Sequence, residues 1–195
     1  MTTANKITIL RIILIPFFVV EMIYYVRTGN EVHRLAGVLA FAVASILDGV
    51  DGYVARRYHQ TSELGTVLDP LADKLLLVSA IIFLNFNNQP YLRTIPLWLT
   101  GIVIGRDILL AIGAVIVRLM AGSVVVRPHL TGKLATVFQM LVVAWILMRW
   151  DLGMGWLDEL ILGAGLLTVV SGLFYLYDGM QQLAAHPSSS SSFKK

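Results

Sequence analysis

The stretches DGVDGYVAR (residues 48–56) and GTVLDPLAD (residues 65–73) set four aspartates into an otherwise apolar chain. The aspartates of the first stretch are three residues apart, and those of the second are four apart. Both spacings place the paired carboxylates on one face of a helix. The short segment between the stretches predicts two antiparallel neighbouring helices, which would gather the carboxylates at one end. The aspartates are Asp48, Asp51, Asp69 and Asp73.

The composition is that of a membrane protein. Of the 195 residues, 57% are hydrophobic and only 14% are charged, and the mean hydropathy is +0.76. Soluble domains carry about a quarter charged residues. The chain has no cysteine, which excludes disulfides, thiolate zinc sites and cysteine nucleophiles. The net charge of +3 is spread along the chain and gives no reason to expect nucleic acid as a partner.

Six apolar stretches reach or approach the roughly 20 residues that a helix needs to cross a bilayer. We therefore predict an all-α fold, an integral membrane bundle of six transmembrane helices that forms a single catalytic domain over residues 1–185. The serine-rich tail, residues 186–195, is predicted to be disordered. A polar segment with Asn87, Asn88 and Pro90 separates the third stretch from the fourth. The stretches are 7–26, 35–54, 70–86, 95–120, 134–148 and 157–177.

The basic residues predict how these helices are oriented. Of those near loops, which leaves out Arg11, Lys74 and Arg106, eight lie on the side of the two termini and four lie on the other side. Because cytoplasmic loops carry the excess of lysine and arginine, both termini and the aspartate end of the bundle are predicted to be cytoplasmic. The eight are Lys6, Arg56, Arg57, Arg118, Arg127, Lys133, Lys194 and Lys195, and the four are Arg27, Arg34, Arg93 and Arg149.

Four carboxylates at a membrane boundary repel one another and are costly to desolvate, so they need cations. All-oxygen ligation suits a hard ion such as Mg2+ or Mn2+, and four carboxylates exceed what one Mg2+ usually takes from protein. Two ions are therefore expected, and such a pair can clamp an in-line displacement at phosphorus. Gly52 would let a ligand approach the helix closely, and Arg56 is placed to pair with a phosphate oxygen.

Each aspartate also has a structural interpretation. Asp69 precedes Pro70 and could be a helix N-cap with proline at the first helical position. Asp48 or Asp51 could be a helix-end charge in the headgroup layer, and Lys74 could pair with a neighbouring aspartate. The joint pattern of aspartates, glycines and arginine favours the metal site over these interpretations.

The two stretches resemble the signature of the CDP-alcohol phosphatidyltransferases, D-x2-D-G-x2-A-R-x8-G-x3-D-x3-D, and match it at every specified position. Two further segments, NKITILR at residues 5–11 and GKLATVFQM at residues 132–140, resemble the family members whose acceptor is glycerol 3-phosphate. Together these resemblances cover most of the chain up to the fifth apolar stretch.

The resemblance implies a homodimer in the bacterial inner membrane, with a site that opens to the cytoplasm. Such an enzyme transfers a phosphatidyl group from CDP-diacylglycerol to an alcohol and releases CMP. By match, the four aspartates would ligate two Mg2+ or Mn2+ ions, and Asp73 would also act as general base on the acceptor hydroxyl. Gly52, Arg56 and Ser62 would contact the CDP portion.

The acceptor depends on basic residues elsewhere in the chain. Arg106 and Asp107 lie midway along the fourth apolar stretch, where ionisable residues usually face the protein interior. They either form an ion pair with another helix or bind the acceptor. The next arginine follows twelve residues later, a spacing that resembles the CMP-dependent cardiolipin synthases, whose acceptor is phosphatidylglycerol. Glycerol 3-phosphate is the first prediction, and its candidate contacts are Asn5, Thr8, Arg106, Arg118, Arg127 and Lys133.

Two further questions stay open at this stage. Arg11, near the cytoplasmic end of the first apolar stretch, either anchors the helix at the interface or takes part in binding. A divalent-cation transporter, surrounded by membrane lipids like the enzyme, would also place carboxylates between helices. A transporter needs polar groups along a path through the bilayer, whereas the aspartates here cluster at one face.

Overall fold

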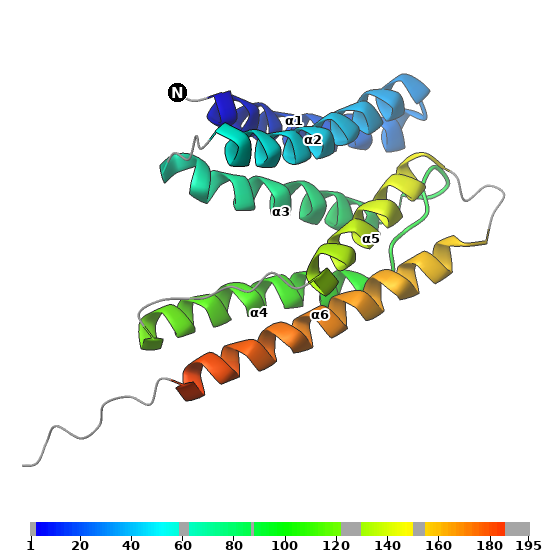
Figure 1. Cartoon of the computed structure of the whole chain (residues 1–195). Coiled ribbons are helices and arrows are strands. Elements are labelled where there is room, and N and C mark those ends of the chain that lie inside the picture. Colours follow the sequence, from blue (N-terminus) through cyan, green and yellow to red (C-terminus); the bar gives the residue numbers. More distant parts are fainter. Residues whose placement is uncertain (1–2, 59–62, 87, 122–129, 150–154, 186–195) are drawn as a thin grey trace, which may run out of the picture. The chain divides into compact units, whose positions relative to one another are not determined.

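The computed structural model describes residues 3–58, 63–86, 88–121, 130–149 and 155–185. Side chains are described for residues 8–48, 74–86, 88–117, 119, 130–149 and 155–181. The prediction of an all-α fold is confirmed over the described residues, which form six helices and no strand (Figure 1). The helices are α1 (Thr3–Thr28), α2 (Glu31–Tyr58), α3 (Glu63–Asn85), α4 (Leu97–Ala121), α5 (Leu130–Leu147) and α6 (Leu157–Ala185).

Each helix covers one predicted stretch, and several extend beyond it. One large difference is at α3, which begins at Glu63 and not near residue 70. The last helix, α6, continues to Ala185, past the expected end at residue 177. Hydropathy indicates only the part of a helix that lies in apolar surroundings, so the polar ends of these helices carry no such signal.

Within the described part of the chain, four helices are long and apolar enough to cross a membrane by length and composition. The apolar part of α3, Lys74–Asn85, is shorter, and α2 carries Glu31, Arg34 and Asp48. The number of spans and the cytoplasmic placement of both termini therefore stay predictions. The four segments are Thr8–Thr28, Leu97–Val117, Leu130–Leu147 and Leu157–Gln181.

The contacts divide the chain into two compact units. Unit 1 comprises residues 1–96 and 143–154, and unit 2 comprises residues 97–142 and 155–195. Unit 1 contains α1, α2 and α3, while unit 2 contains α4 and α6. The fifth helix, α5, contributes its C-terminal end to unit 1 and the rest to unit 2.

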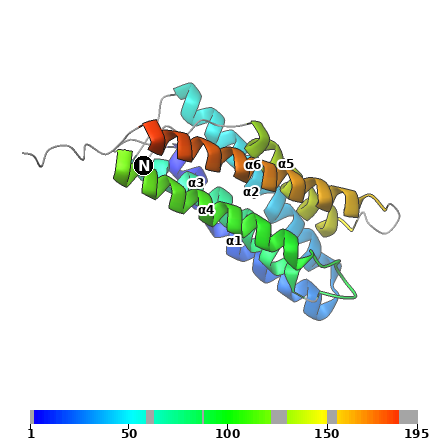
Figure 2. The same ribbon diagram turned by 90° about the horizontal axis from the view of Figure 1, so that it is seen from below.

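In unit 1, α1 packs against both α2 and α3, and α2 packs against α3 (Figures 1 and 2). Most of the buried side chains of these helices are apolar, and Phe18 and Met22 are fully buried. The ring centroids of Phe18 and Phe41 are 5.6 Å apart. Gly37 allows the close approach of α1 and α2, because a Cβ there would lie 2.6 Å from the Met22 sulfur.

The turn between α1 and α2 explains why these helices form a tight pair. Gly29 ends α1 in the left-handed region, with φ of 70°, and its N–H donates to the Tyr25 carbonyl at 2.8 Å. Asn30 then caps α2, because its Oδ1 accepts the N–H of Val32 at 3.0 Å. A cap residue following directly on a helix-ending glycine reverses the chain within two residues.

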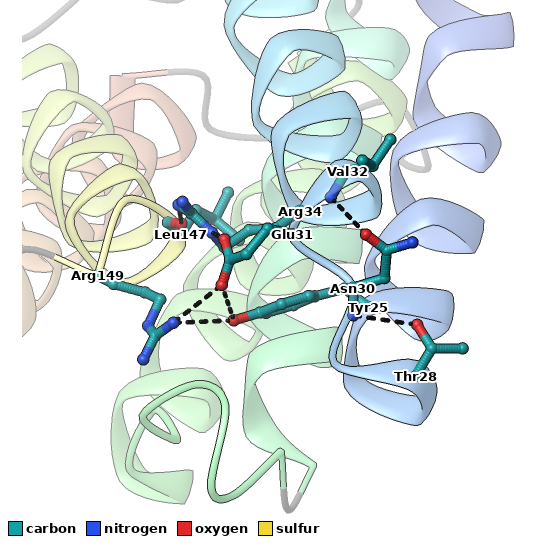
Figure 3. A network of polar contacts seen from close by, with 8 residues as sticks. All are labelled: Tyr25, Thr28, Asn30, Glu31, Val32, Arg34, Leu147 and Arg149. Atoms are coloured by element: carbon teal, nitrogen blue, oxygen red, sulfur yellow. Dashed lines mark hydrogen bonds and ion pairs between the residues drawn. The ribbon is translucent and has the colours of Figure 1, made fainter.

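A polar cluster, here called the turn network, joins this turn to the end of α5 (Figure 3). Glu31 Oε1 accepts from Arg149 Nη1 at 3.0 Å and from the Tyr25 hydroxyl at 3.3 Å, and Oε2 accepts from Arg34 Nε at 2.5 Å. Arg34 Nη1 also donates to the Leu147 carbonyl at 3.1 Å. Arg149 adopts a φ of 57°, just after the helix ends. The network consists of Tyr25, Glu31, Arg34 and Arg149.

In unit 2, α4 and α6 lie side by side, as Figures 1 and 2 both show. Gly165 of α6 gives room to an aromatic side chain of α4, because a Cβ there would lie 2.6 Å from the Trp98 ring. The first part of α5 reaches α6 through buried polar groups: Gln139 Nε2 donates to the Thr168 hydroxyl at 2.7 Å. Thr168 in turn donates to the Ala164 carbonyl at 2.6 Å.

Candidate functional site

The backbone of unit 1 brings the two aspartate-bearing segments together. Asp48 and Asp51 lie in the C-terminal half of α2, and Asp69 and Asp73 lie in the N-terminal half of α3. The two helices contact each other and run in opposite directions (Figure 1). The predicted antiparallel helix pair is therefore confirmed. The convergence of all four carboxylates stays a prediction, because among the four only the Asp48 side chain lies within the described residues.

The interpretation of Asp69 as a helix N-cap is wrong. Because α3 begins at Glu63, Asp69 lies more than one turn inside the helix and Pro70 follows it there. Proline has no N–H, so α3 lacks one backbone hydrogen bond at this point. The N-cap interpretation rested on the assumption that the polar residues before Pro70 were loop.

Arg11 of α1 pairs with the first aspartate of the pattern. Its Nη1 lies 2.5 Å from Asp48 Oδ1, and its side chain is completely buried, whereas that of Asp48 is 29% exposed. The interpretation of Arg11 as an interfacial anchor is therefore wrong, because an anchoring guanidinium would reach water or headgroups. Thr8, a predicted acceptor contact, is also fully buried and lies three residues earlier, on the same face of α1.

The Arg11–Asp48 pair fits a site for a hard cation. A carboxylate offers about four acceptor positions, so one hydrogen bond from Arg11 leaves positions for a metal ion. A charge-assisted bond from a buried arginine also fixes the direction of the carboxylate. Carboxylate oxygens are the ligands that Mg2+ and Mn2+ prefer, so the donor set of the two stretches suits such ions.

A second arginine site lies in unit 2. Arg106 Nη1 donates to Asp107 Oδ1 at 2.9 Å, and its Nη2 donates to the Ser171 hydroxyl at 2.9 Å. The guanidinium carbon lies 5.7 Å from the centroid of the Tyr175 ring. The Arg106 side chain is 8% exposed, and its Nε is buried without a hydrogen-bond partner in the described structure. We call Arg106, Asp107, Ser171 and Tyr175 the Arg106 cluster.

Arg106 pairs with its neighbour Asp107, and an ion pair of either residue with another helix stays a prediction. The carboxylate that accepts from Arg106 belongs to Asp107, the next residue of the same helix, and the Ser171 hydroxyl of α6 accepts from another nitrogen of the guanidinium. Sequence reasoning did not identify Ser171 or Tyr175. Their spacing of four residues on one face of α6 was the available signal, but a serine and a tyrosine in an apolar helix are too common to be diagnostic.

The remaining predicted contacts are only partly described. Lys133 is exposed near the start of α5, beside Gly132. Asn5, Gly52, Arg56 and Arg118 lie in helices, but their side chains are outside the described residues, and Ser62, Arg127 and the tail at 186–195 lie wholly outside them.

Comparisons with known proteins agree with the resemblance noted in the sequence. A family profile described as CDP-alcohol phosphatidyltransferase matches residues 1–177. A relative from Bacillus subtilis (strain 168) is 36% identical over 154 residues, which cover 74% of this chain and 76% of the relative. Relatives from Shigella flexneri serotype 5b and Escherichia coli K12 are each 32% identical and cover 87% of this chain and 90% of their own length. All three relatives are named CDP-diacylglycerol–glycerol-3-phosphate 3-phosphatidyltransferase.

Proposed function

Because this chain belongs to the CDP-alcohol phosphatidyltransferase family, we propose that it transfers a phosphatidyl group from CDP-diacylglycerol to glycerol 3-phosphate and releases CMP. The observation that carries this proposal is the likeness to relatives named for that reaction, at 32–36% identity over most of the chain. The antiparallel α2–α3 pair supports it physically, because it brings the aspartate-bearing segments to the same end of unit 1.

The aspartates Asp48, Asp51, Asp69 and Asp73 would hold two Mg2+ or Mn2+ ions. Bound divalent ions neutralise the diphosphate and stabilise the leaving CMP. Asp73 removes the proton from the acceptor hydroxyl, whose oxygen forms a bond to the lipid-linked phosphorus. The bond from this phosphorus to the CMP oxygen breaks, and CMP leaves with the electron pair.

The other substrate contacts follow the predicted roles. Gly52, Arg56 and Ser62 contact the CDP portion, with the arginine on a phosphate oxygen. Arg11 is a positioning residue that orients the Asp48 carboxylate. The acceptor phosphate is bound by residues drawn from Asn5, Thr8, Arg106, Arg118, Arg127 and Lys133.

One observation favours a second acceptor. Arg106 and Arg118 are twelve residues apart, the spacing that resembles the cardiolipin synthases. Phosphatidylglycerol is therefore the alternative acceptor, and the names of the relatives place glycerol 3-phosphate first. For either acceptor we propose a homodimer in the bacterial inner membrane, with six spans, cytoplasmic termini and the aspartates facing the cytoplasm.

The experiment that tests this function is an assay of CMP release by the purified protein. CDP-diacylglycerol and Mg2+ or Mn2+ are supplied with either glycerol 3-phosphate or phosphatidylglycerol. We expect CMP release with glycerol 3-phosphate. Activity with phosphatidylglycerol alone would replace the first acceptor by the second. Absence of CMP release with both, together with cation uptake into liposomes, would favour the transporter instead.

Asp73→Asn tests the general base. The amide keeps the size of the side chain but cannot take a proton, so turnover should fall by about 100-fold or more while CDP-lipid binding stays measurable. The matched control is Glu159→Gln, at an exposed carboxyl in the first turn of α6, which should turn over like wild type. Turnover of Asp73→Asn near the wild-type rate would rule out this role.

A further inference from the structure

The Arg106 guanidinium in unit 2 is held from several directions. Asp107 accepts from Nη1, Ser171 accepts from Nη2, and the Tyr175 ring lies 5.7 Å from the guanidinium carbon. Ser171 is fully buried, so water cannot replace its hydroxyl as the acceptor. Ser171 and Tyr175 are four residues apart, which places both contacts on one face of α6. The position of the guanidinium is therefore set by α6 as well as by its own helix.

A third helix, α5, also approaches Arg106. A Cβ on Gly132 of α5 would lie 3.0 Å from the Tyr175 hydroxyl and 3.2 Å from Arg106 Nη2. Both distances are shorter than ordinary contacts of a Cβ, so a side chain at this position of α5 would press on Tyr175 and Arg106. The exposed Lys133 follows directly in the sequence. The cluster therefore lies beside the first turn of α5, which carries the basic residue Lys133.

The hydrogen-bonding capacity of Arg106 is not exhausted by these contacts. A guanidinium has five N–H donors, and the two hydrogen bonds described use one donor on each terminal nitrogen. The Nε donor is buried and has no partner among the described residues. The terminal nitrogens each keep one further N–H, and an anion such as a phosphate would take charge-assisted hydrogen bonds from these donors.

We propose that Ser171 and Tyr175 of α6 are positioning residues, which hold the Arg106 guanidinium so that its free donors face the phosphate group of the acceptor. This rests on the proposed function for the identity of the anion. Ser171 fixes one terminal nitrogen by accepting its hydrogen bond, and Tyr175 supports the cation through its ring face. Neither residue touches the reacting atoms, so both act through Arg106 and determine how tightly the acceptor binds.

The test separates acceptor affinity from turnover. Ser171→Ala removes the hydrogen bond with little change in volume, and Tyr175→Leu removes the ring, whereas Tyr175→Phe keeps the ring and loses only the hydroxyl. We expect Ser171→Ala to raise KM for glycerol 3-phosphate by about 10-fold, the range of a hydrogen bond to a charged group. Tyr175→Leu should raise it about 3-fold or more, and Tyr175→Phe, which keeps the ring, should raise it less than Tyr175→Leu does.

Two readouts distinguish positioning from a structural effect. The kcat and the KM for CDP-diacylglycerol should change by less than about twofold in all these variants, because only the acceptor phosphate meets Arg106. The matched control is Ser79→Ala in α3, whose hydroxyl donates to the Leu76 carbonyl at 3.0 Å, and which should leave KM for the acceptor unchanged. A parallel fall in kcat, in both KM values and in thermal stability would overturn the inference.

Failure of the inference can be told apart from failure of the proposed function. If the wild-type protein releases no CMP with glycerol 3-phosphate, the proposed function fails. The same variants are then assayed with phosphatidylglycerol, because its phosphate group can also bind Arg106. If the wild type is active but Ser171→Ala keeps the wild-type KM for its acceptor, positioning by α6 is wrong. Ser171→Ala decides the question even if Tyr175→Leu does not fold.

Discussion

The turn network of unit 1 and the Arg106 cluster of unit 2 are both built around arginine, a carboxylate and a tyrosine, yet they differ in exposure and in hydrogen bonding. In the turn network, Glu31 is half exposed and Arg149 is 32% exposed, so solvent reaches both charges. In the Arg106 cluster, the arginine is 8% exposed and carries a buried donor without a described partner. An exposed network stabilises a turn at little cost, whereas a buried cation with an unused donor is expensive unless a ligand completes it.

Replacing one arginine in each cluster tests this contrast most strongly. Arg106→Met should raise KM for glycerol 3-phosphate by about 100-fold, because removal of a buried charge that binds an anion costs about 2–5 kcal/mol. Arg149→Met, with the same change in side chain, should lower thermal stability and leave this KM within about twofold, because exposed ion pairs contribute about 0.2–1 kcal/mol. Steady-state kinetics and thermal unfolding in detergent provide the measurements. Equal KM values for glycerol 3-phosphate in the two variants would show that the Arg106 cluster is no more important for acceptor binding than the turn network.

Glycine-to-alanine changes near each cluster give the next largest difference. In Gly132→Ala the new methyl group meets Arg106 Nη2 at 3.2 Å, so the guanidinium must shift by a few tenths of an ångström. Such a displacement should raise KM for the acceptor by about 5-fold, because acceptor binding depends on exact placement of the charge. We expect a smaller loss of stability than in Gly29→Ala, since Gly132 lies in a helix without positive φ and the atoms it would meet belong to side chains and not to the backbone.

Gly29→Ala is the matched change beside the turn network. Gly29 has a φ of 70°, and its added Cβ would lie 2.7 Å from the Tyr91 hydroxyl, so the backbone is strained and a side chain must move. This variant should lose about 1–2 kcal/mol of stability with the acceptor KM unchanged. Thermal unfolding and steady-state kinetics are measured for both variants. Loss of stability in Gly132→Ala together with loss of acceptor affinity in Gly29→Ala would contradict the assignment of binding to the Arg106 cluster and of stability to the turn network.

The sequence predicts the elements of these clusters better than their contacts. Helical periodicity and the short connection between residues 56 and 65 were enough to predict the antiparallel α2–α3 pair. The partner of Arg11 was not predictable, because Asp48 lies 37 residues away and the pairing depends on how α1 packs against α2. Likewise, Arg106 and Ser171 are 65 residues apart, and their contact depends on the packing of α4 against α6.

The start of α3 was missed for a local reason. Proline is common in the first turn of a helix, so Asp69-Pro70 reads as a helix start, and only the tertiary structure reveals a helix that begins at Glu63. The turn at Gly29 carries a local signal that hydropathy, which gave the stretches 7–26 and 35–54, does not detect. Glycine followed by asparagine is a strong local signal for a helix end and a helix start, and local geometry alone accounts for it.

Glu31→Gln isolates the carboxylate of the turn network. The amide has nearly the same shape, but it removes the negative charge that two arginines share. At neutral pH we expect a fall of a few degrees in Tm and unchanged KM values for both substrates, because the network supports only the α1–α2 turn and the end of α5. Glu159→Gln, at an exposed carboxyl of α6, should not change Tm. An altered acceptor KM in Glu31→Gln would show that the turn network also has a functional role.

The smallest expected effect is the pH dependence of the difference in Tm between wild type and Glu31→Gln. The hydrogen bond from Arg34 lowers the pKa of Glu31 below its ordinary value, and the positive charges of Arg34 and Arg149 act in the same direction. Because the pKa is lower in the folded protein, the stabilisation is complete above the unfolded value of about 4.3 and is lost as the pH falls through the folded value. The Tm difference between wild type and Glu31→Gln should therefore shrink steadily below about pH 4. A difference that stayed constant from neutral to acid pH would mean that the shape of the side chain, and not its charge, holds the turn network together.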